Sequence, residues 1–229
     1  PYTPRKHQAH LHKQIDKHRW NVLVCHRRFG KTVCMINHLI RSALLSKLKN
    51  PRFAYIAPTF KQAKSIAWDY MKQFTAKIPH TKFNETELRV DLPNGSRITL
   101  LGSESPDGLR GIYLDGCVID EYANVNSKLF PEIIRPALSD RKGYCVFIGT
   151  PMGMNNNFYE LYQHAQGAED WFNYKAKASD TKIVDNDELV KAKEVMGEKK
   201  YLQEFECDWI ANIEGAVYGD VIAKLDDDK

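Results

Sequence analysis

Short apolar runs alternate with longer amphipathic segments along most of this 229-residue chain. An apolar or alternating run predicts a strand, whereas apolar residues spaced three and four apart predict a helix. Strands are expected at 21–25, 53–57, 88–92, 97–101, 116–120 and 144–149, with a further candidate at 172–177. Helices are expected at 31–48, 60–77, 126–138, 154–166, 186–196 and 198–207. Pro93, Asn94 and Gly95 lie between two alternating runs and predict a hairpin turn.

This alternation predicts an α/β fold. Apolar strands separated by helices form a mostly parallel central sheet that helices cover on both faces. We expect the core at residues 1–151, a small and more polar lid or linker subdomain at 152–212, and a tail at 213–229. The chain starts at Pro1 rather than Met and ends in an acidic run, so we expect it to be a piece of a longer protein.

A phosphate-binding loop is predicted between the first strand and the helix that follows it. The string CHRRFGKT matches G-x-x-x-x-G-K-S/T, except that Cys25 stands at the first glycine position. Such a loop turns backbone N–H groups toward phosphate at a helix N-terminus. Lys31 would neutralise the β- and γ-phosphates, and Thr32 would place its hydroxyl on Mg²⁺. The predicted nucleotide-binding residues are Cys25, His26, Arg27, Arg28, Phe29, Gly30, Lys31 and Thr32. A basic turn before a helix is the alternative for this string alone.

A second motif lies at the end of another apolar strand. Cys117, Val118 and Ile119 lead into Asp120 and Glu121, where an open α/β sheet binds its ligands. Asp120 is expected in the Mg²⁺ shell, and Glu121 is expected to orient and deprotonate the attacking water. Alone, the pair also fits a solvated helix N-terminus, where acidic residues are favoured. Behind a phosphate loop in the right order, it predicts a hydrolase rather than a nucleotide switch.

Composition changes this picture little. Hydrophobic residues make up 43% of the chain, enough for a core, and the formal charge of +4 is compatible with nucleic acid without demonstrating it. Five cysteines without a C-x-x-C pair predict buried free thiols in a reducing compartment. No apolar run approaches the ~18 residues of a membrane span and no signal peptide is present, so we expect a soluble, cytosolic chain with no membrane partner.

Three further positions have both an ordinary and a functional explanation. Arg110, in the loop SPDGLRG, is either a solvated charge or an arginine finger that reaches the γ-phosphate of a neighbouring subunit. Thr150 ends the strand after the acidic motif and belongs either to a simple turn or to the same site. Gln8 is an ordinary surface residue or a contact to an adenine edge, to which an amide can both donate and accept.

Taken together, these strings resemble the ATPase domain of the large terminase subunit, the DNA-packaging motor of tailed bacteriophages. The matching pieces are Gln8, HRRFGKT, APTFKQAKSIAW, LRGIYLDGCVIDEYA, IGTP and EFECDWI. The resemblance implies a RecA-like P-loop NTPase fold of the additional-strand, glutamate-containing type, in a family that tolerates a residue other than glycine at the first loop position. It also implies a C-terminal metal-dependent nuclease domain. The present residues leave no room for one, so no DNA cutting is expected of them.

Carried over by position, the resemblance assigns roles to residues of both motifs. Gln8 resembles the adenine-contacting glutamine, while Lys31 and Thr32 resemble the phosphate- and Mg²⁺-binding pair. Asp120 resembles the acid of the metal shell, acting through water, and Glu121 resembles the catalytic glutamate.

The remaining assignments concern the residue that couples hydrolysis to movement and the arginine that reaches the γ-phosphate. Thr150 resembles the residue of the coupling motif, and Arg110 resembles an arginine that acts in trans. Some terminases are thought to use a loop arginine in cis, so Arg27 and Arg28 stay in contention for that role.

The expected function is Mg²⁺-dependent hydrolysis of ATP that drives double-stranded DNA into a viral prohead. The resemblance implies as partners double-stranded DNA, further copies of the chain in a ring that is pentameric on a portal, the portal protein and the small terminase subunit. The resemblance also implies that the protein acts in the host cell cytoplasm and is absent from the mature virion. A helicase-like translocase with the same core is the alternative, but it would need a second RecA-like lobe. A GTPase switch would need an N-K-x-D motif, and a DNA-binding scaffold with a vestigial site would not need the intact motif residues.

Overall fold

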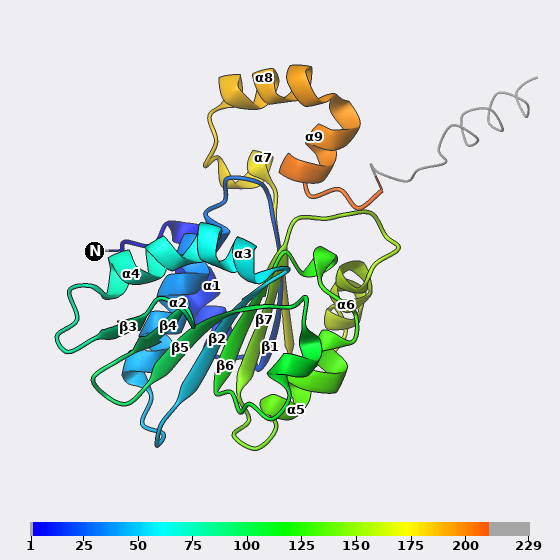
Figure 1. The fold of residues 1–229 in the computed structure, drawn as a ribbon. Helices are drawn as coiled ribbons and strands as arrows, with labels where there is room; N and C mark the ends of the chain where they lie inside the picture. Colours follow the sequence, from blue (N-terminus) through cyan, green and yellow to red (C-terminus); the bar gives the residue numbers. More distant parts are fainter. Residues whose placement is uncertain (1, 211–229) are drawn as a thin grey trace, which may run out of the picture.

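The computed structural model describes residues 2–210, in which eight strands form one sheet with helices on both faces (Figure 1). The strands are β1 (Trp20–Cys25), β2 (Arg52–Ala57), β3 (Lys82–Asn84), β4 (Arg89–Asp91), β5 (Arg97–Gly102), β6 (Gly116–Asp120), β7 (Tyr144–Gly149) and β8 (Trp171–Ala176). Their order in the sheet is β3-β4-β5-β2-β6-β7-β1-β8. The strands from β5 to β8 in this order pair in parallel, whereas β3 and β4 are antiparallel additions at one edge. The predicted α/β class and mostly parallel sheet are confirmed.

The helical segments lie around the sheet, with a small group at its upper end. The α-helices are α1 (Lys6–Ile15), α2 (Lys31–Leu45), α3 (Phe60–Ala63), α4 (Asp69–Thr75), α5 (Arg135–Ala137), α6 (Asn157–Ala165), α7 (Ala178–Thr181), α8 (Asn186–Met196) and α9 (Glu198–Phe205). Shorter segments are the π-helical turns η1 (Lys64–Trp68) and η4 (Phe130–Ile134) and the 3₁₀ turns η2 (Pro106–Leu109) and η3 (Tyr122–Asn124). Among residues 2–210, no helix has both the length and the apolar character that a membrane crossing requires.

Two apolar layers hold the sheet between its helices. Alternate residues of the central strands face opposite sides, so Leu23 packs into the layer with α1 and α2 while Val22 packs into the layer with α6. Residues of β1, β6 and β7 are buried on both faces almost throughout. This double burial explains why these strands are continuous apolar runs and were easy to predict.

The predicted strands and the hairpin are confirmed, and the differences at helix ends have local causes. The turn at residues 93–95 joins β4 to β5, and Gly95 takes the left-handed φ of 82° that its turn requires. The helix predicted at 31–48 ends at Leu45 because Asn94 and Ser96 bind its last carbonyl groups, those of Ala43 and Leu44.

Other helix predictions were wrong in extent. The helix predicted at 60–77 ends at Thr75 and contains the π-helical turn η1, and the one predicted at 126–138 begins only at Phe130. Among the α-helices and strands of residues 2–210, three were not predicted at all: α1, β3 and α7. The first has few buried apolar residues in a polar stretch, and the other two are only three and four residues long, too short for a periodic pattern.

The segment after residue 151 contributes to two parts of the structure. Along its whole length β8 pairs with β1, and α6 packs against both strands. In contrast, α7, α8 and α9 lie above the upper end of the sheet (Figure 1) around a small apolar cluster of Ala178, Leu189 and Phe205. The domain boundary at 151 stays a prediction, and the tail predicted at 213–229 lies outside the described residues.

Candidate active site

The predicted phosphate loop connects the carboxyl end of β1 to the N-terminus of α2. Gly30 occupies the N-cap position with a left-handed φ of 88°, and Arg28 is also left-handed at 69°. The left-handed φ favours glycine here, and a β-carbon on Gly30 would lie 3.0 Å from Nε2 of Gln8, which would have to shift slightly. Among residues 2–210, no side chain caps the first turn of α2, and that turn contains no acidic residue. Its N–H groups therefore form a site suited to an anion.

Lys31 is the point where three predicted residues meet. Its Nζ donates a hydrogen bond of 3.1 Å to Oγ1 of Thr150 and lies 3.5 Å from the carbonyl oxygen of Cys25. The same Nζ lies 3.8 Å from Oε1 of Glu121. These residues end three neighbouring parallel strands, or follow directly after them, so the sheet brings together positions far apart in the sequence.

A cavity of about 250 Å³ opens beside this lysine. Residues of the strand ends and of α9 line it, and α9 lies above the strand ends (Figure 1). Its lining residues are Arg27, Lys31, Glu121, Asn124, Thr150, Pro151, Met152, Lys200, Gln203 and Glu204. The sequence motifs predicted Arg27, Lys31, Glu121 and Thr150 as site residues. The α9 residues at this cavity were not predicted, because nothing in their spacing places that helix over the loop.

Asp120 is held in a buried network that includes a residue the sequence reasoning missed. Its Oδ1 accepts a hydrogen bond of 2.9 Å from the N–H of Glu121, and its Oδ2 accepts one from the hydroxyl of Tyr55 on the adjacent strand β2. Thr32 lies close enough to Tyr55 for its side chain to oppose the rise that burial causes in the pKa of the tyrosine hydroxyl. Burial raises the pKa of Asp120, and the bond from Tyr55 and the charge of Lys31 oppose that rise. The sequence did contain a signal for Tyr55: it carries a hydroxyl in the otherwise apolar strand RFAYIA, and a buried hydroxyl needs a hydrogen-bond partner.

The donor set around Asp120 fits Mg²⁺. The Tyr55 hydroxyl is bonded to Asp120 and is also influenced by the side chain of Thr32, so an alcohol and a carboxylate oxygen lie near one another beside the phosphate loop. Oxygen donors are what Mg²⁺ prefers, and it keeps several waters while taking one or two carboxylates plus substrate phosphates. Among residues 2–210, no group of three or more His, Cys, Asp or Glu side chains is placed to hold a metal ion.

Glu121 combines an unusual backbone with a basic carboxylate. Its φ of 47° is left-handed, a conformation that costs a residue other than glycine about 1–3 kcal/mol and that is concentrated at functional sites. Burial raises the pKa of Glu121, the ammonium of Lys31 opposes this, and the charges of Asp120 and Glu204 add to it. A raised pKa makes the carboxylate a better proton acceptor, as a general base requires.

Gln8 lies against the phosphate loop rather than on the open surface. Only 4% of it is exposed; its Nε2 donates to the carbonyl of Gly30 at 3.3 Å, and its Oε1 accepts from the N–H of Arg5 at 3.0 Å. The adenine contact predicted for it stays a prediction. A separate cavity of about 400 Å³ lies nearby, lined in part by Arg5, Arg28 and Phe205.

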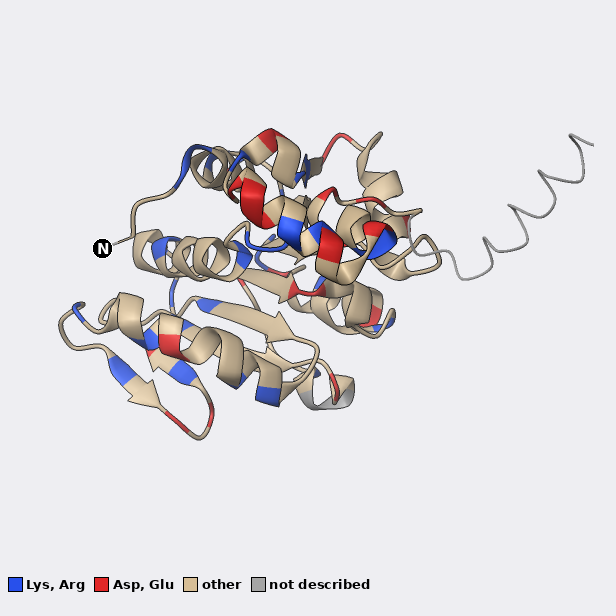
Figure 2. Cartoon of the chain, turned by 90° about the horizontal axis from the view of Figure 1, so that it is seen from above, with Lys and Arg blue, Asp and Glu red and all other residues tan. Residues whose placement is uncertain are grey.

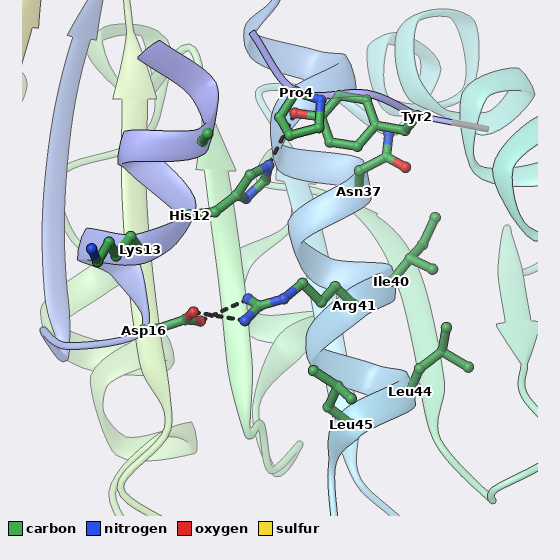
Figure 3. Close-up of a pocket in the computed structure, with 11 residues that line it drawn as sticks. Tyr2, Pro4, His12, Lys13, Asp16, Asn37, Ile40, Arg41, Leu44 and Leu45 are labelled. Atoms are coloured by element: carbon green, nitrogen blue, oxygen red, sulfur yellow. Dashed lines mark hydrogen bonds and ion pairs between the residues drawn. The ribbon is translucent and has the colours of Figure 1, made fainter. Parts of the chain in front are cut away.

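Figure 3 shows polar contacts around the groove between α1 and α2. The hydroxyl of Tyr2 lies 2.9 Å from Nε2 of His12, and Asp16 accepts two hydrogen bonds from Arg41 at 2.8 and 2.9 Å. The groove between the two helices encloses about 720 Å³, more than the cavity at Lys31, yet none of the predicted catalytic residues lines it. Volume alone would thus have pointed to the wrong place.

The other loop residues play different parts. Cys25, His26 and Phe29 are buried, and the ring nitrogens of His26 lie 2.6 Å from the carbonyl of Arg27 and 2.8 Å from Oγ1 of Thr181. These side chains support the loop from behind. Arg27 faces the cavity, whereas Arg28 faces the neighbouring one.

Arg110 is not brought to the cavity within this chain. It follows η2, and its Nη2 lies 3.8 Å from Oε2 of Glu132, on η4. Its guanidinium is more than half exposed. The trans role stays a prediction, and Arg27 is the arginine that the fold places beside Lys31 and Glu121.

The sequence pattern of the family described as "Terminase large subunit, T4likevirus-type, N-terminal" matches residues 24–219. The large terminase subunit of Thermus phage G20c is 27% identical over 180 residues, which cover 70% of this chain and 36% of that protein. This chain therefore spans little more than a third of the length of that relative.

Solved structures show the same fold. The large terminase ATPase domain of Thermus phage P74-26 aligns with a TM-score of 0.77 and 21% identity, over 91% of this chain and 95% of that one. The large terminase of another thermophilic bacteriophage, in complex with ADP, aligns with a TM-score of 0.77 and 16% identity, over 90% of this chain and 53% of that one. The match over most of the sequence and the shared fold agree with the motifs, and the chain belongs to the family of N-terminal domains of T4likevirus-type terminase large subunits.

Proposed function

We propose that this chain is the ATP-hydrolysing part of a motor that moves double-stranded DNA into a viral prohead. The observation that carries the proposal is the meeting of Glu121 and Thr150 within 3.8 Å of the Lys31 ammonium, at the N-terminus of an uncapped helix. Its relatives support it: one is called an ATPase domain, and another was solved with ADP and with ATP-gamma-S.

The chemistry follows from the positions of these groups. The first turn of α2 and Lys31 bind the phosphates of ATP, and Thr32 and Asp120 would hold Mg²⁺, which neutralises phosphate charge when bound. Glu121 accepts a proton from the attacking water. The water oxygen bonds to the γ-phosphorus, the bond from that phosphorus to the bridging oxygen breaks, and its electron pair stays on ADP.

Lys31 links nucleotide binding to the strength of the base. In this structure its Nζ contacts Thr150 and lies near Glu121, and its charge opposes the rise in the pKa of that carboxylate. A bound phosphate competes for that ammonium. Once Lys31 turns to the phosphate, Glu121 loses the opposing charge and becomes a stronger base, and the hydroxyl of Thr150 is released. Thr150 would then pass the change on to the segment that follows β7.

The helices above the site act as a lid in this proposal. The N–H of Arg27 donates to the carbonyl of Glu204 on α9 at 2.7 Å, and His26 contacts Thr181 on α7. The lid surface carries mixed charges (Figure 2), including ion pairs of Lys191 with Glu188 and of Lys193 with Glu198. It is therefore not a single basic surface for DNA, and we assign the DNA contact to no patch of it.

Assembly and specificity complete the proposal. Five copies of the chain would form a ring on a portal and would act there with the small terminase subunit and DNA. This assembly would work inside the host cell during capsid assembly. Arg110 would reach the γ-phosphate of the neighbouring subunit, since it is exposed and lies away from its own cavity. Gln8 would read the adenine edge.

Steady-state ATPase measured across protein concentration, with and without DNA, tests this assembly. An arginine supplied in trans is worth about 10³–10⁵ in rate, so specific activity should rise steeply as subunits associate. Arg110→Ala and Glu121→Ala should each be slow alone and regain activity when mixed. If each variant assembles and mixing restores nothing, Arg110 does not act in trans, and Arg27 becomes the candidate. A protein without ATPase activity under any of these conditions would overturn the proposed function.

A further inference from the structure

Gln203 on α9 is a buried amide at the catalytic cavity that the proposed reaction does not yet use. It is only 2% exposed, and its side chain lines the same cavity as Lys31 and Glu121. Its Oε1 has no hydrogen-bond partner in the described part of the chain. A buried polar group left without a partner destabilises a fold by about 1–3 kcal/mol. The oxygen of Gln203 is therefore free to accept a hydrogen bond from a bound group.

The position of Gln203 is fixed relative to the phosphate loop. The next residue, Glu204, accepts the backbone N–H of Arg27 at 2.7 Å and pairs with its guanidinium at 3.9 Å. Lys200, one turn earlier, pairs with Glu204 at 2.9 Å. These contacts tie α9 to the loop, and the charge of Glu204 is close enough to act on Glu121. Gln203 is thus held in a defined place in the part of the lid that lines the cavity.

A water that attacks phosphorus needs acceptors for both of its hydrogens. When both are occupied, one lone pair of the water oxygen is left to point at the γ-phosphorus. Glu121 supplies one acceptor, Lys31 is a donor only, and the Thr150 hydroxyl already uses one of its two lone pairs to accept from Lys31. Gln203 lines the same cavity, and its buried, unpartnered oxygen is an acceptor of the required kind.

We propose that Gln203 binds the attacking water as its second acceptor and holds it in line with the γ-phosphate. This inference rests on the proposed hydrolysis of ATP. In the reaction, Glu121 takes one proton of the water, while the other O–H stays hydrogen-bonded to the Gln203 oxygen. The new bond joins the water oxygen to phosphorus, the bond to the bridging oxygen breaks, and ADP leaves with the electron pair. Gln203 is unchanged at the end.

Two substitutions test this role. Gln203→Met keeps the length of the side chain and removes the amide, and Gln203→Asn keeps the amide but draws it back by one methylene group. Misplacing a reacting group by about 1 Å can cost on the order of 10²-fold in rate, so both variants should lose about that much in single-turnover hydrolysis. Affinity for ATP-gamma-S should stay within about twofold, because the interaction is made to water and not to the nucleotide. Gln163→Met on the exposed surface of α6 is the matched control and should change neither quantity.

Thermal unfolding separates this role from simple packing. Replacing an unpartnered buried amide by an apolar group is neutral or stabilising, so Gln203→Met should melt no lower than the wild type. Wild-type turnover in a folded Gln203→Met or Gln203→Asn variant overturns the inference, and so does a loss of ATP-gamma-S affinity with turnover at saturation unchanged. If Glu121→Gln abolishes turnover while the Gln203 variants keep it, only this inference fails. If the wild type does not hydrolyse ATP, the proposed function fails and this inference fails with it.

Discussion

The hydroxyl of Tyr55 is predicted to keep the buried carboxylate of Asp120 ionised, and Tyr55→Phe removes that hydroxyl alone. Asp120 is 5% exposed and receives two hydrogen bonds, from Tyr55 and from the N–H of Glu121. A hydrogen bond to a charged group contributes about 1.5–3 kcal/mol, so the free energy of unfolding should fall by about that amount at neutral pH. For a domain of this size the melting temperature should then fall by about 3–12 °C.

The pH dependence identifies the cause of this loss. Burial already raises the pKa of Asp120, and the Tyr55 bond opposes the rise, so the folded variant should hold its proton to a higher pH than the folded wild type. The variant then binds more protons when folded, and its stability falls more steeply as pH rises. The difference in unfolding free energy should be small below the pKa of Asp120 in the folded wild type. It should open as pH rises through that value and level off above the pKa of the variant.

A matched substitution elsewhere in the fold provides the control. The hydroxyl of Tyr144 is bonded to Oγ of Ser42 at 3.1 Å, a neutral pair. Tyr144→Phe should cost about 0.5–1.5 kcal/mol, with no dependence on pH near the pKa of Asp120. The two variants are compared by urea unfolding between about pH 4 and 8. This range spans the titration of a carboxyl with a raised pKa. Equal losses without pH dependence would refute the reasoning about Asp120.

Three further outcomes are expected. Gly30→Ala places a β-carbon 3.0 Å from Nε2 of Gln8 at a left-handed φ, so calorimetry should show a loss of about 1–2 kcal/mol in stability together with weaker ADP binding; unchanged values would argue against the loop geometry. Gln8→Ala should reduce the preference for ATP over GTP by about 1–3 kcal/mol in competition binding, and equal affinities in the wild type would remove Gln8 from the adenine site. All five cysteines are buried, and burial raises the pKa of Cys34 and of Cys207 to about 12, so a thiol reagent at neutral pH should label the chain only after unfolding.

Much of the sheet was predictable because its central strands are buried on both faces. The strand at 116–120 was located to the residue, and the acidic pair that follows it could be placed at the sheet edge from strand order alone. The phosphate loop was equally visible, since Gly30, Lys31 and Thr32 are adjacent in the sequence and their roles depend on local geometry.

What sequence reasoning missed depends on contacts between distant segments. Tyr55 lies in an ordinary apolar strand and matters only because β2 is the neighbour of β6. Gln203 matters only because α9 is tied to the loop through Arg27 and Glu204, a contact that no periodicity encodes. Gln8 was singled out, but its burial against Gly30 depends on α1, a helix too polar to predict.

The central claim is that Glu121 activates water for an attack on ATP bound at Lys31, and single-turnover hydrolysis by Glu121→Gln tests it most directly. The substitution keeps the shape of the side chain and removes the proton acceptor. With protein in excess over radiolabelled ATP, the variant should bind ATP as tightly as the wild type and hydrolyse it about 10²–10⁴-fold more slowly. Lys31→Ala, measured alongside, should lose binding as well as turnover. Hydrolysis by Glu121→Gln at a near-normal rate would contradict the account.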